Sequence, residues 1–155
     1  MKNVWFYDYP VGSTAIAEKN GAITDIFFGK KKNLKSFIKN ETPVIKKAAK
    51  QLGEYFDGKR KGFDLPLAFE GTDFQIKVWK ELLNIPIGET RSYKDIAVKI
   101  GNPKACRAVG AANGKNKIWI IVPCHRVIGS NSSLTGYAGG LKAKEMLLDL
   151  EKQYA

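Results

Sequence analysis

One short segment of the sequence holds the residue types best suited to covalent chemistry. Cys124, His125 and Arg126 are consecutive, and His125 is the only histidine in a chain that has two cysteines. A cysteine beside a potential base and a fixed cation can be stabilised as its thiolate, which is the nucleophilic form. A buried, inert thiol is the alternative, because free cysteines often act as small core residues. One histidine and two cysteines cannot close a tetrahedral zinc site, so we expect no metal.

The apolar run before this segment predicts the element that positions the cysteine. Residues 118–122 read Ile-Trp-Ile-Ile-Val, which has strong strand propensity. We expect a buried strand that ends at Pro123 and carries Cys124 at its end. Neighbouring side chains on a strand point to opposite sides, unless a turn intervenes. This counts against a cysteine hydrolase in which Cys124 and His125 form a catalytic pair, although it does not exclude one.

Two capping-box patterns mark helix starts ahead of that run. Thr72 with Gln75 precedes one apolar-periodic stretch, and Ser92 with Asp95 precedes another. The first helix should stop before Ile85-Pro86, because the residue before a proline disfavours helical geometry.

A helix-turn-helix follows from the next signals. The helix after Ser92 should stop at Gly101, and Asn102-Pro103 should start a third helix that runs to about Asn113-Gly114. At 100° per residue, one face of this helix is apolar and should face the core, with Ala105, Val109 and Ala112. The opposite face is cationic with little bulk, with Lys104, Arg107, Gly110, Ala111 and Gly114. Such a face suits close approach to a DNA groove or tight packing on another protein element.

The first half of the chain has a mixed pattern. Asn20-Gly21 between alternating stretches predicts a hairpin. Thr42-Pro43 predicts the N-cap and first position of a helix over about 43–57. Residues 58–71 hold three glycines and a proline, which indicates a connection. We therefore predict an α+β protein with a small N-terminal α/β lobe, 1–70, and a mostly helical C-terminal domain, 71–155, that carries the helix-turn-helix.

The net charge of +11 lies in two blocks. Residues 30–61, which include Lys30-Lys31-Lys32, carry +8, and residues 91–126 carry +7. Such an excess predicts a polyanionic partner, with nucleic acid first and an anionic membrane second. No apolar run has the length of a membrane span and the N-terminus lacks the apolar core of a signal peptide. We expect a soluble, cytoplasmic protein.

Residues 121–129, IVPCHRVIG, resemble the active-site signature of the O6-alkylguanine-DNA alkyltransferases, also called methylated-DNA–protein-cysteine methyltransferases. The resemblance extends without gaps over residues 72–151 and includes segments 88–93, 101–103, 107–110, 112–114 and 137–141. It implies an RNase H-like N-terminal lobe and a winged-helix-like C-terminal domain. It also implies an irreversible, single-turnover transfer of an alkyl group from O6 of a flipped guanine to Cys124, without a cofactor.

The resemblance implies roles for individual residues at the reacting centre. His125 would take the proton of Cys124 through a bridging water, and Glu151 would orient and charge-stabilise His125. Asn116 would support the segment that leads to the cysteine. Tyr93 would offer its hydroxyl to the flipped base, so that guanine leaves as a neutral ring.

The remaining implied roles concern DNA and the base pocket. Arg107 would occupy the stack that the flipped nucleotide vacates. Backbone groups around Val127, Tyr137 and Ala138 would read the guanine edge. The predicted DNA-binding set is Ser92, Tyr93, Lys104, Ala105, Arg107, Gly110, Ala111 and Gly114.

The expected partner is double-stranded DNA that contains O6-alkylguanine, bound by a monomer without a membrane. The main alternative is a helix-turn-helix DNA-binding protein, such as a regulator, with a structural Cys124. It predicts sequence-specific binding and an unchanged protein mass.

Overall fold

Two units make up the chain in the computed structural model, Met1–Phe69 and Glu70–Ala155. The boundary lies one residue from the position at which the sequence divides into 1–70 and 71–155. The structure describes residues 1–29, 33–129 and 137–155, so the predicted run Lys30-Lys31-Lys32 lies outside the described residues. The mixed α+β prediction is confirmed, with a sheet in the first unit and mainly helices in the second.

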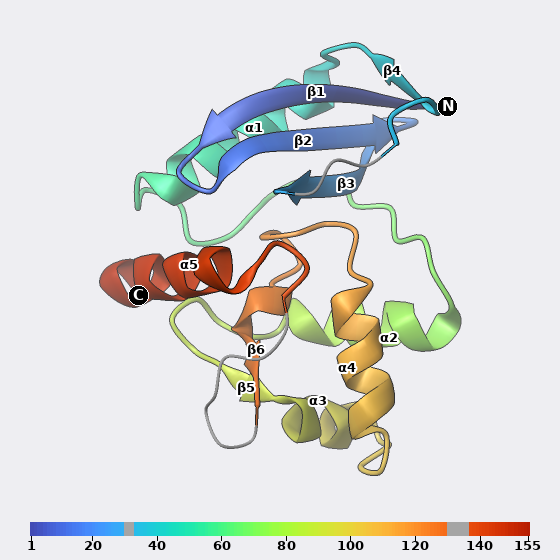
Figure 1. Cartoon of the computed structure of the whole chain (residues 1–155), viewed down its shortest axis with the longest axis vertical. Coiled ribbons are helices and arrows are strands. Elements are labelled where there is room, and N and C mark those ends of the chain that lie inside the picture. Colours follow the sequence, from blue (N-terminus) through green and yellow to red (C-terminus); the bar gives the residue numbers. More distant parts are fainter. Residues whose placement is uncertain (30–32, 130–136) are drawn as a thin grey trace. The chain divides into compact units, whose positions relative to one another are not determined.

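The first unit is built on a sheet with the strand order β3-β2-β1-β4 (Figure 1). Strands β1 (Lys2–Tyr9), β2 (Gly12–Lys19) and β3 (Ala22–Phe28) form an antiparallel meander, and β4 (Phe37–Lys39) runs parallel to β1. The predicted hairpin at Asn20-Gly21 joins β2 to β3, and both residues have positive φ, 54° and 82°. Asparagine and glycine tolerate this geometry best, which explains their position there.

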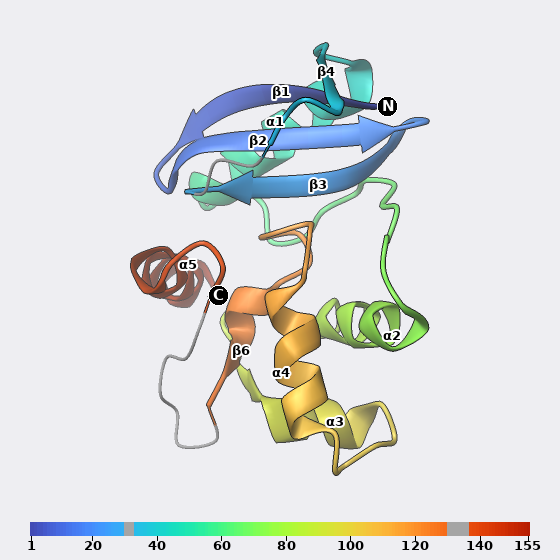
Figure 2. The ribbon, with the colours of Figure 1, turned by 45° about the vertical axis from the view of Figure 1, so that its right-hand side comes forward.

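Helix α1 (Pro43–Phe56) covers one face of this sheet (Figures 1 and 2). Its buried residues include Ile45, Leu52 and Tyr55, so the predicted amphipathic pattern is confirmed. Thr42 has the extended backbone of an N-cap, but its side chain makes no capping hydrogen bond. The predicted N-cap at Thr42 and the proline at the helix start are therefore confirmed, and Pro43, whose fixed φ favours the helix, sets the start without a side-chain cap.

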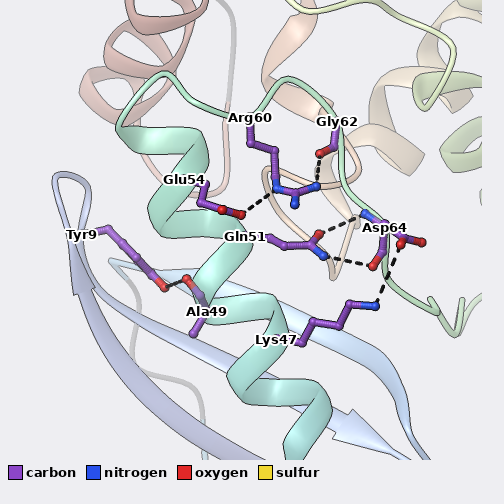
Figure 3. A network of polar contacts seen from close by, with 8 residues as sticks. All are labelled: Tyr9, Lys47, Ala49, Gln51, Glu54, Arg60, Gly62 and Asp64. Carbon is purple, nitrogen blue, oxygen red and sulfur yellow. Dashed lines mark hydrogen bonds and ion pairs between the residues drawn. The ribbon is translucent and has the colours of Figure 1, made fainter.

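Polar contacts fasten the connection after α1 to the helix (Figure 3). The side-chain amide of Gln51 donates to the carbonyl of Asp64 at 3.1 Å and accepts from its backbone N–H at 2.9 Å. Arg60 donates to Glu54 at 3.0 Å and to the carbonyl of Gly62 at 3.1 Å. Farther along, Ile23 of β3 donates to the Pro66 carbonyl at 2.8 Å. The glycine-rich connection is thus ordered by side chains of α1 and by a strand edge.

The second unit contains the two predicted capping boxes. Helix α2 (Asp73–Leu82) starts at Thr72, and α3 (Tyr93–Lys99) starts at Ser92. In each, the cap side chain accepts from the backbone three residues on, and that residue's side chain accepts from the cap. Helix α4 (Cys106–Gly114) packs on both α2 and α3 (Figure 2), and Trp79 of α2 donates to the Ala112 carbonyl of α4 at 2.8 Å.

The start of α4 differs from the prediction. The sequence pattern starts this helix at Pro103, but residues 103–105 form a turn in which Ala105 N–H donates to the Asn102 carbonyl at 3.0 Å. Ala105 is the N-cap, with φ −92° and ψ 25°. Lys104 and Ala105 therefore precede the helix. The predicted core side holds at Val109 and Ala112, which are buried.

The rest of the second unit consists of short segments and a final helix. The 3-10 helix η1 (Cys124–Arg126) leads into β6 (Val127–Ile128), which pairs in parallel with β5 (Arg91–Ser92). Helix α5 (Leu141–Tyr154) packs against η1. Over the three described ranges, no helix is both long enough and apolar enough to cross a membrane.

Candidate active site

The segment before Cys124 is buried but is not a strand. Residues 118–122 form successive turns, in which Ile121 donates to the Trp119 carbonyl at 2.8 Å and Val122 to the Ile118 carbonyl at 3.0 Å. Ile120 has a positive φ of 72°, which a strand does not contain. The predicted strand is therefore wrong, although the predicted burial is right.

Asn116 explains why the segment folds into turns. Its side-chain amide accepts from Ile118 N–H at 3.0 Å and donates to the carbonyls of Ile118 at 3.4 Å and Val122 at 2.9 Å. Its own carbonyl accepts from the indole of Trp119 at 2.8 Å. Backbone groups that a neighbouring strand would otherwise pair are satisfied by this one side chain. These hydrogen bonds are the means by which Asn116 would support the segment before Cys124, as the resemblance implies.

Cys124 lies at the start of η1 and is 3% exposed. The turn is closed by the N–H of Val127, which donates to the Cys124 carbonyl. Asn113 of α4 also donates to this carbonyl, at 3.3 Å. Burial raises the pKa of the Cys124 thiol to about 11, against hydrogen bonds from Asn116 and Tyr137 and the positive charge of Lys144. In this state Cys124 is therefore a thiol, and a base must remove its proton before the sulfur can attack.

His125 has the geometry of that base. Its Nε2 lies 2.6 Å from Oε2 of Glu151. Hydrogen bonds and charge from His125 and Arg126 overcome burial and lower the pKa of Glu151 to about 2, so the carboxylate is ionised and can only accept. The proton of neutral His125 therefore lies on Nε2, and Nδ1 is the basic nitrogen. Nδ1 is buried and has no hydrogen-bond partner within the described residues.

Arg126 completes the cluster, and the sequence pattern had given it only the role of a fixed cation beside Cys124. Its Nε donates to Oε1 of Glu151 at 2.7 Å, and one terminal nitrogen donates to Oε2 at 3.0 Å. The other terminal nitrogen donates to the Ile85 carbonyl at 2.7 Å. Glu151 thus binds both His125 and Arg126 with two oxygens. Burial lowers the pKa of His125 even though Glu151 opposes this, so the ring is neutral in the resting cluster.

Lys144 was missed entirely, although a signal was present. It is fully buried, and its Nζ donates to the Val127 carbonyl at 2.6 Å. Lys144, Leu147 and Glu151 are the buried residues of α5, at a spacing that places them on one helix face. A lysine on the apolar stripe of an otherwise amphipathic helix could have been noticed. Which group it meets could not, because its partner is 17 residues away in the sequence.

The predicted base-pocket residues have well-defined places. Val127 is buried, and its carbonyl is the group that Lys144 holds. The ring of Tyr137 lies 5.9 Å from that of Trp119, and Tyr137 is close enough to Cys124 to favour the thiolate and so oppose the rise in the pKa of the thiol. Ala138 follows in a turn and is partly exposed. Tyr137 is therefore next to the reactive sulfur.

The helix-turn-helix positions the predicted DNA-contacting residues. Arg107 is exposed in the first turn of α4. The hydroxyl of Ser92 accepts from Asp95 N–H at 3.0 Å, so it is occupied as a helix cap. Tyr93 packs on α4, where a Cβ added to Gly110 would lie 3.8 Å from its ring. The remaining positions of the face are exposed: Lys104, Ala111 and Gly114. The cationic face with little bulk is thus open apart from Gly110.

No metal ligand set stands out near these groups. Within residues 1–29, 33–129 and 137–155, no three His, Cys, Asp or Glu side chains gather so that they could hold a metal ion. Cys106 is partly exposed, and its sulfur lies 3.8 Å from the Pro103 carbonyl at the start of α4.

A helix-turn-helix packed around a buried cysteine with its own histidine and glutamate defines a DNA-binding protein equipped for covalent transfer. Comparisons with known proteins agree. Residues 73–153 match the model of the 6-O-methylguanine DNA methyltransferase, DNA binding domain, and residues 5–69 match that of the ribonuclease-like domain of the same proteins. The chain belongs to the 6-O-methylguanine DNA methyltransferase family.

Individual relatives are similar over nearly the whole chain. A methylated-DNA–protein-cysteine methyltransferase of Methanosarcina barkeri is 52% identical, over 95% of this chain and 97% of the relative. The constitutive one of Bacillus subtilis is 50% identical, over 92% and 91%. A crystal structure of Mycobacterium tuberculosis OGT in complex with DNA has a TM-score of 0.91 at 46% identity, covering 99% of this chain and 94% of the other.

Proposed function

We propose that this protein repairs duplex DNA by moving an alkyl group from O6 of guanine to its own Cys124. DNA repair by alkyl transfer to a cysteine is the function of its family relatives, and the DNA complex of a homologue supports duplex DNA as the partner. One observation carries the assignment to Cys124: the neighbouring His125 is held at 2.6 Å by a buried, ionised Glu151, with its other nitrogen basic. The proposal includes action as a monomer in the cytoplasm.

The reaction balances without a cofactor. The thiol proton of Cys124 passes through a bridging water to Nδ1 of His125, and Glu151 stabilises the imidazolium that results. The sulfur then forms a bond to the alkyl carbon as the bond from that carbon to O6 breaks, with its electron pair remaining on guanine. Tyr93 donates a proton to the leaving base, and the tyrosine is restored by the proton released from Cys124. The products are a thioether on the protein and an unmodified guanine.

The same reaction explains why the protein acts once. The thiolate of Cys124 is a poor leaving group from an unactivated alkyl carbon, so the thioether is not cleaved to regenerate the thiol. Arg107, exposed at the start of α4, would fill the stack while the guanine is flipped out. Flipping costs a few kcal/mol, so a planar cation in the gap lowers the barrier to reaching the site.

Intact-mass measurement tests the function directly. After incubation with duplex DNA that contains O6-methylguanine, the protein should gain one methylene unit per molecule, on the peptide that holds Cys124. Cys124→Ser should gain nothing, while Cys106→Ser should react as the wild type does. Unmodified wild-type protein with the lesion still in the DNA would refute the proposal. An unchanged mass together with sequence-specific binding would favour a helix-turn-helix regulator.

The basic block of the first unit is proposed to act over long range. This block, residues 30–61, contains none of the residues proposed for the active site. Its exposed cations include Lys39, Lys46 and Lys50. Changing all three to glutamine should lower the association rate with duplex DNA at low salt, because steering weakens as charges are removed. The difference should vanish at high ionic strength, and the rate of transfer in the bound complex should not change. Stopped-flow association over a salt series measures this. Equal rates at every salt concentration would mean that the block serves only solvation.

A further inference from the structure

The strongest unexplained feature of the site is a second buried cation. Lys144 has no role in the proton relay of Cys124, His125 and Glu151, yet its side chain is fully buried. A buried lysine costs free energy unless it is compensated by a partner. Its Nζ donates to the Val127 carbonyl at 2.6 Å, which ties the ammonium group to the segment that follows Cys124.

The geometry places this cation beside the reactive turn. Val127 closes the turn by donating its N–H to the Cys124 carbonyl, so the carbonyl that binds Lys144 belongs to the residue that closes the cysteine's own turn. Lys144 and the Cys124 sulfur are within electrostatic reach of each other. Helix α5 delivers Lys144 and Glu151 from the same buried face to neighbouring residues of one short segment, Lys144 to Val127 and Glu151 to His125 and Arg126.

The charged groups described around Cys124 set the electrostatic environment of its sulfur. Arg126 and Lys144 are the cations of the buried cluster, Glu151 is its carboxylate, and His125 is neutral. Glu151 is already bound by Arg126 through two hydrogen bonds. With Cys124 as a thiol the cluster carries one excess positive charge. Moving the thiol proton to His125 leaves this total unchanged but creates a negative charge on the sulfur, and Lys144 is a cation that attracts it.

We propose that Lys144 is the charge partner of the Cys124 thiolate: its buried ammonium, fixed on the Val127 carbonyl, balances the negative charge that forms on sulfur before alkyl transfer. This inference rests on the proposed function, since it concerns the same sulfur. The Cys124 proton goes to His125 as before, and Lys144 neither gives nor takes a proton. When the sulfur becomes a neutral thioether, the compensation is lost.

The other groups near the sulfur, among the residues that the structure describes, do not supply this charge. Tyr137 and Asn116 donate neutral hydrogen bonds, and the buried residues of α2, which packs on η1, have no titratable group: Val78, Trp79 and Leu82. Burial raises the pKa of Cys124 and lowers that of Lys144, while each charge favours the other. The two groups therefore titrate as a coupled pair, and the ammonium with the thiolate is the reactive form.

Variants at Lys144 separate charge from structure. Lys144→Gln keeps a donor on a side chain one atom shorter but removes the charge, and Lys144→Arg keeps the charge. Lys142→Gln, at an exposed position of the same helix, is the matched control. In a Cys106→Ser background, the ultraviolet absorbance of the thiolate reports the titration of Cys124 without any DNA.

We expect the thiolate midpoint to rise by about one pH unit or more in Lys144→Gln and to stay near that of the wild type in Lys144→Arg and Lys142→Gln. Transfer from O6-methylguanine duplex at neutral pH should fall about ten-fold in Lys144→Gln and recover as the pH rises. An unchanged midpoint, or a loss that is equal at every pH, would overturn the inference and leave Lys144 as a support for Val127. A wild type that titrates as expected but accepts no alkyl group from DNA would refute the proposed function instead.

A measurement on the native residues covers the case in which Lys144 variants do not fold. In protein labelled with carbon-13 at the lysine ε position, one lysine should titrate at lower pH in Cys124→Ser than in the wild type, because its counter-charge is gone. Identical lysine titrations in the two proteins would contradict the pairing.

Discussion

Glu151→Gln is expected to lower the free energy of unfolding by on the order of 3 kcal/mol and to slow alkyl transfer by about two orders of magnitude or more. Two carboxylate oxygens of Glu151 accept from three donors, the Nε2 of His125 and two nitrogens of Arg126. A glutamine has one acceptor oxygen, so its NH2 group would face a buried donor. It would also leave Arg126 without its counter-charge, and it would release the ring of His125.

Denaturant unfolding and single-turnover kinetics measure the two effects. Glu145→Gln is the control, because Glu145 is exposed on the same helix. The buried cluster predicts that only Glu151→Gln changes either quantity. If Glu151→Gln matched the control in stability, the bonds of Glu151 to Arg126 would contribute little, and if it matched the control in rate, Glu151 would not orient the base.

The pH dependence of stability gives an independent reading of the same residue. Because the folded state lowers the pKa of Glu151 from 4.5 to about 2, its contribution is complete above pH 4.5 and is lost as the pH falls toward 2. His125, whose pKa is also lowered, changes stability in the same direction, since the unfolded state binds more protons. Wild-type stability should therefore decline steeply in this acid range, and Glu151→Gln should lack part of the slope.

Arg107→Ala is expected to slow repair of an O6-alkylguanine in duplex DNA by about ten- to hundred-fold, and to leave reaction with the free alkylated base within about two-fold. The free base has no stack to leave, so only the duplex reaction needs a residue to hold the gap. Arg107 is exposed at the start of α4, on the face with little bulk, and Cys124 lies elsewhere in the unit. The substitution should therefore not alter the reactive cluster.

Arg107→Lys provides the sharper comparison. Lysine keeps the phosphate attraction but has no planar guanidinium that stacks between bases, so we expect it to bind duplex DNA nearly as well and to repair it slowly. Single-turnover rates at saturating protein, with both substrates, separate the two effects. An equal loss on duplex and free base would remove the role of Arg107 in flipping and point to damage of the site itself.

Local signals in the sequence predicted much of the second unit. Both capping boxes, the stop at Gly101 and the core side of α4 hold in the structure. These features depend on residues within one helical turn of each other, and such signals survive whatever the rest of the chain does. The predicted start of α4 is wrong because Asn102-Pro103 favours a turn as well as a helix start. In the structure, the carbonyl of Asn102 accepts from the N–H of Ala105 in such a turn.

In the segment before Cys124, strand propensity is outweighed by the hydrogen bonds of one side chain. Five apolar residues from Ile118 to Val122 favour a strand, but a strand needs a partner. The side chain of Asn116 hydrogen-bonds to backbone groups of this segment instead. Asn116 lies outside the apolar run on which the strand prediction was based. The turn that follows also removes the argument that Cys124 and His125 must point apart, so it is the family and not strand geometry that speaks against a hydrolase.

The sequence alone predicted the candidate reactive pair, the family and the class of partner, because these depend on the identity of side chains in one short segment and on total charge. Only the tertiary structure decided the electrostatics. Helix α5 lies more than a dozen residues after the cysteine, and its packing brings Glu151 to His125 and Lys144 to the Val127 carbonyl. Burial then raises the pKa of the thiol and lowers that of the histidine, which no local pattern contains. The chemistry of Cys124 thus depends on its neighbours in space, since the energy of an electrostatic interaction depends on how far the surrounding groups exclude water.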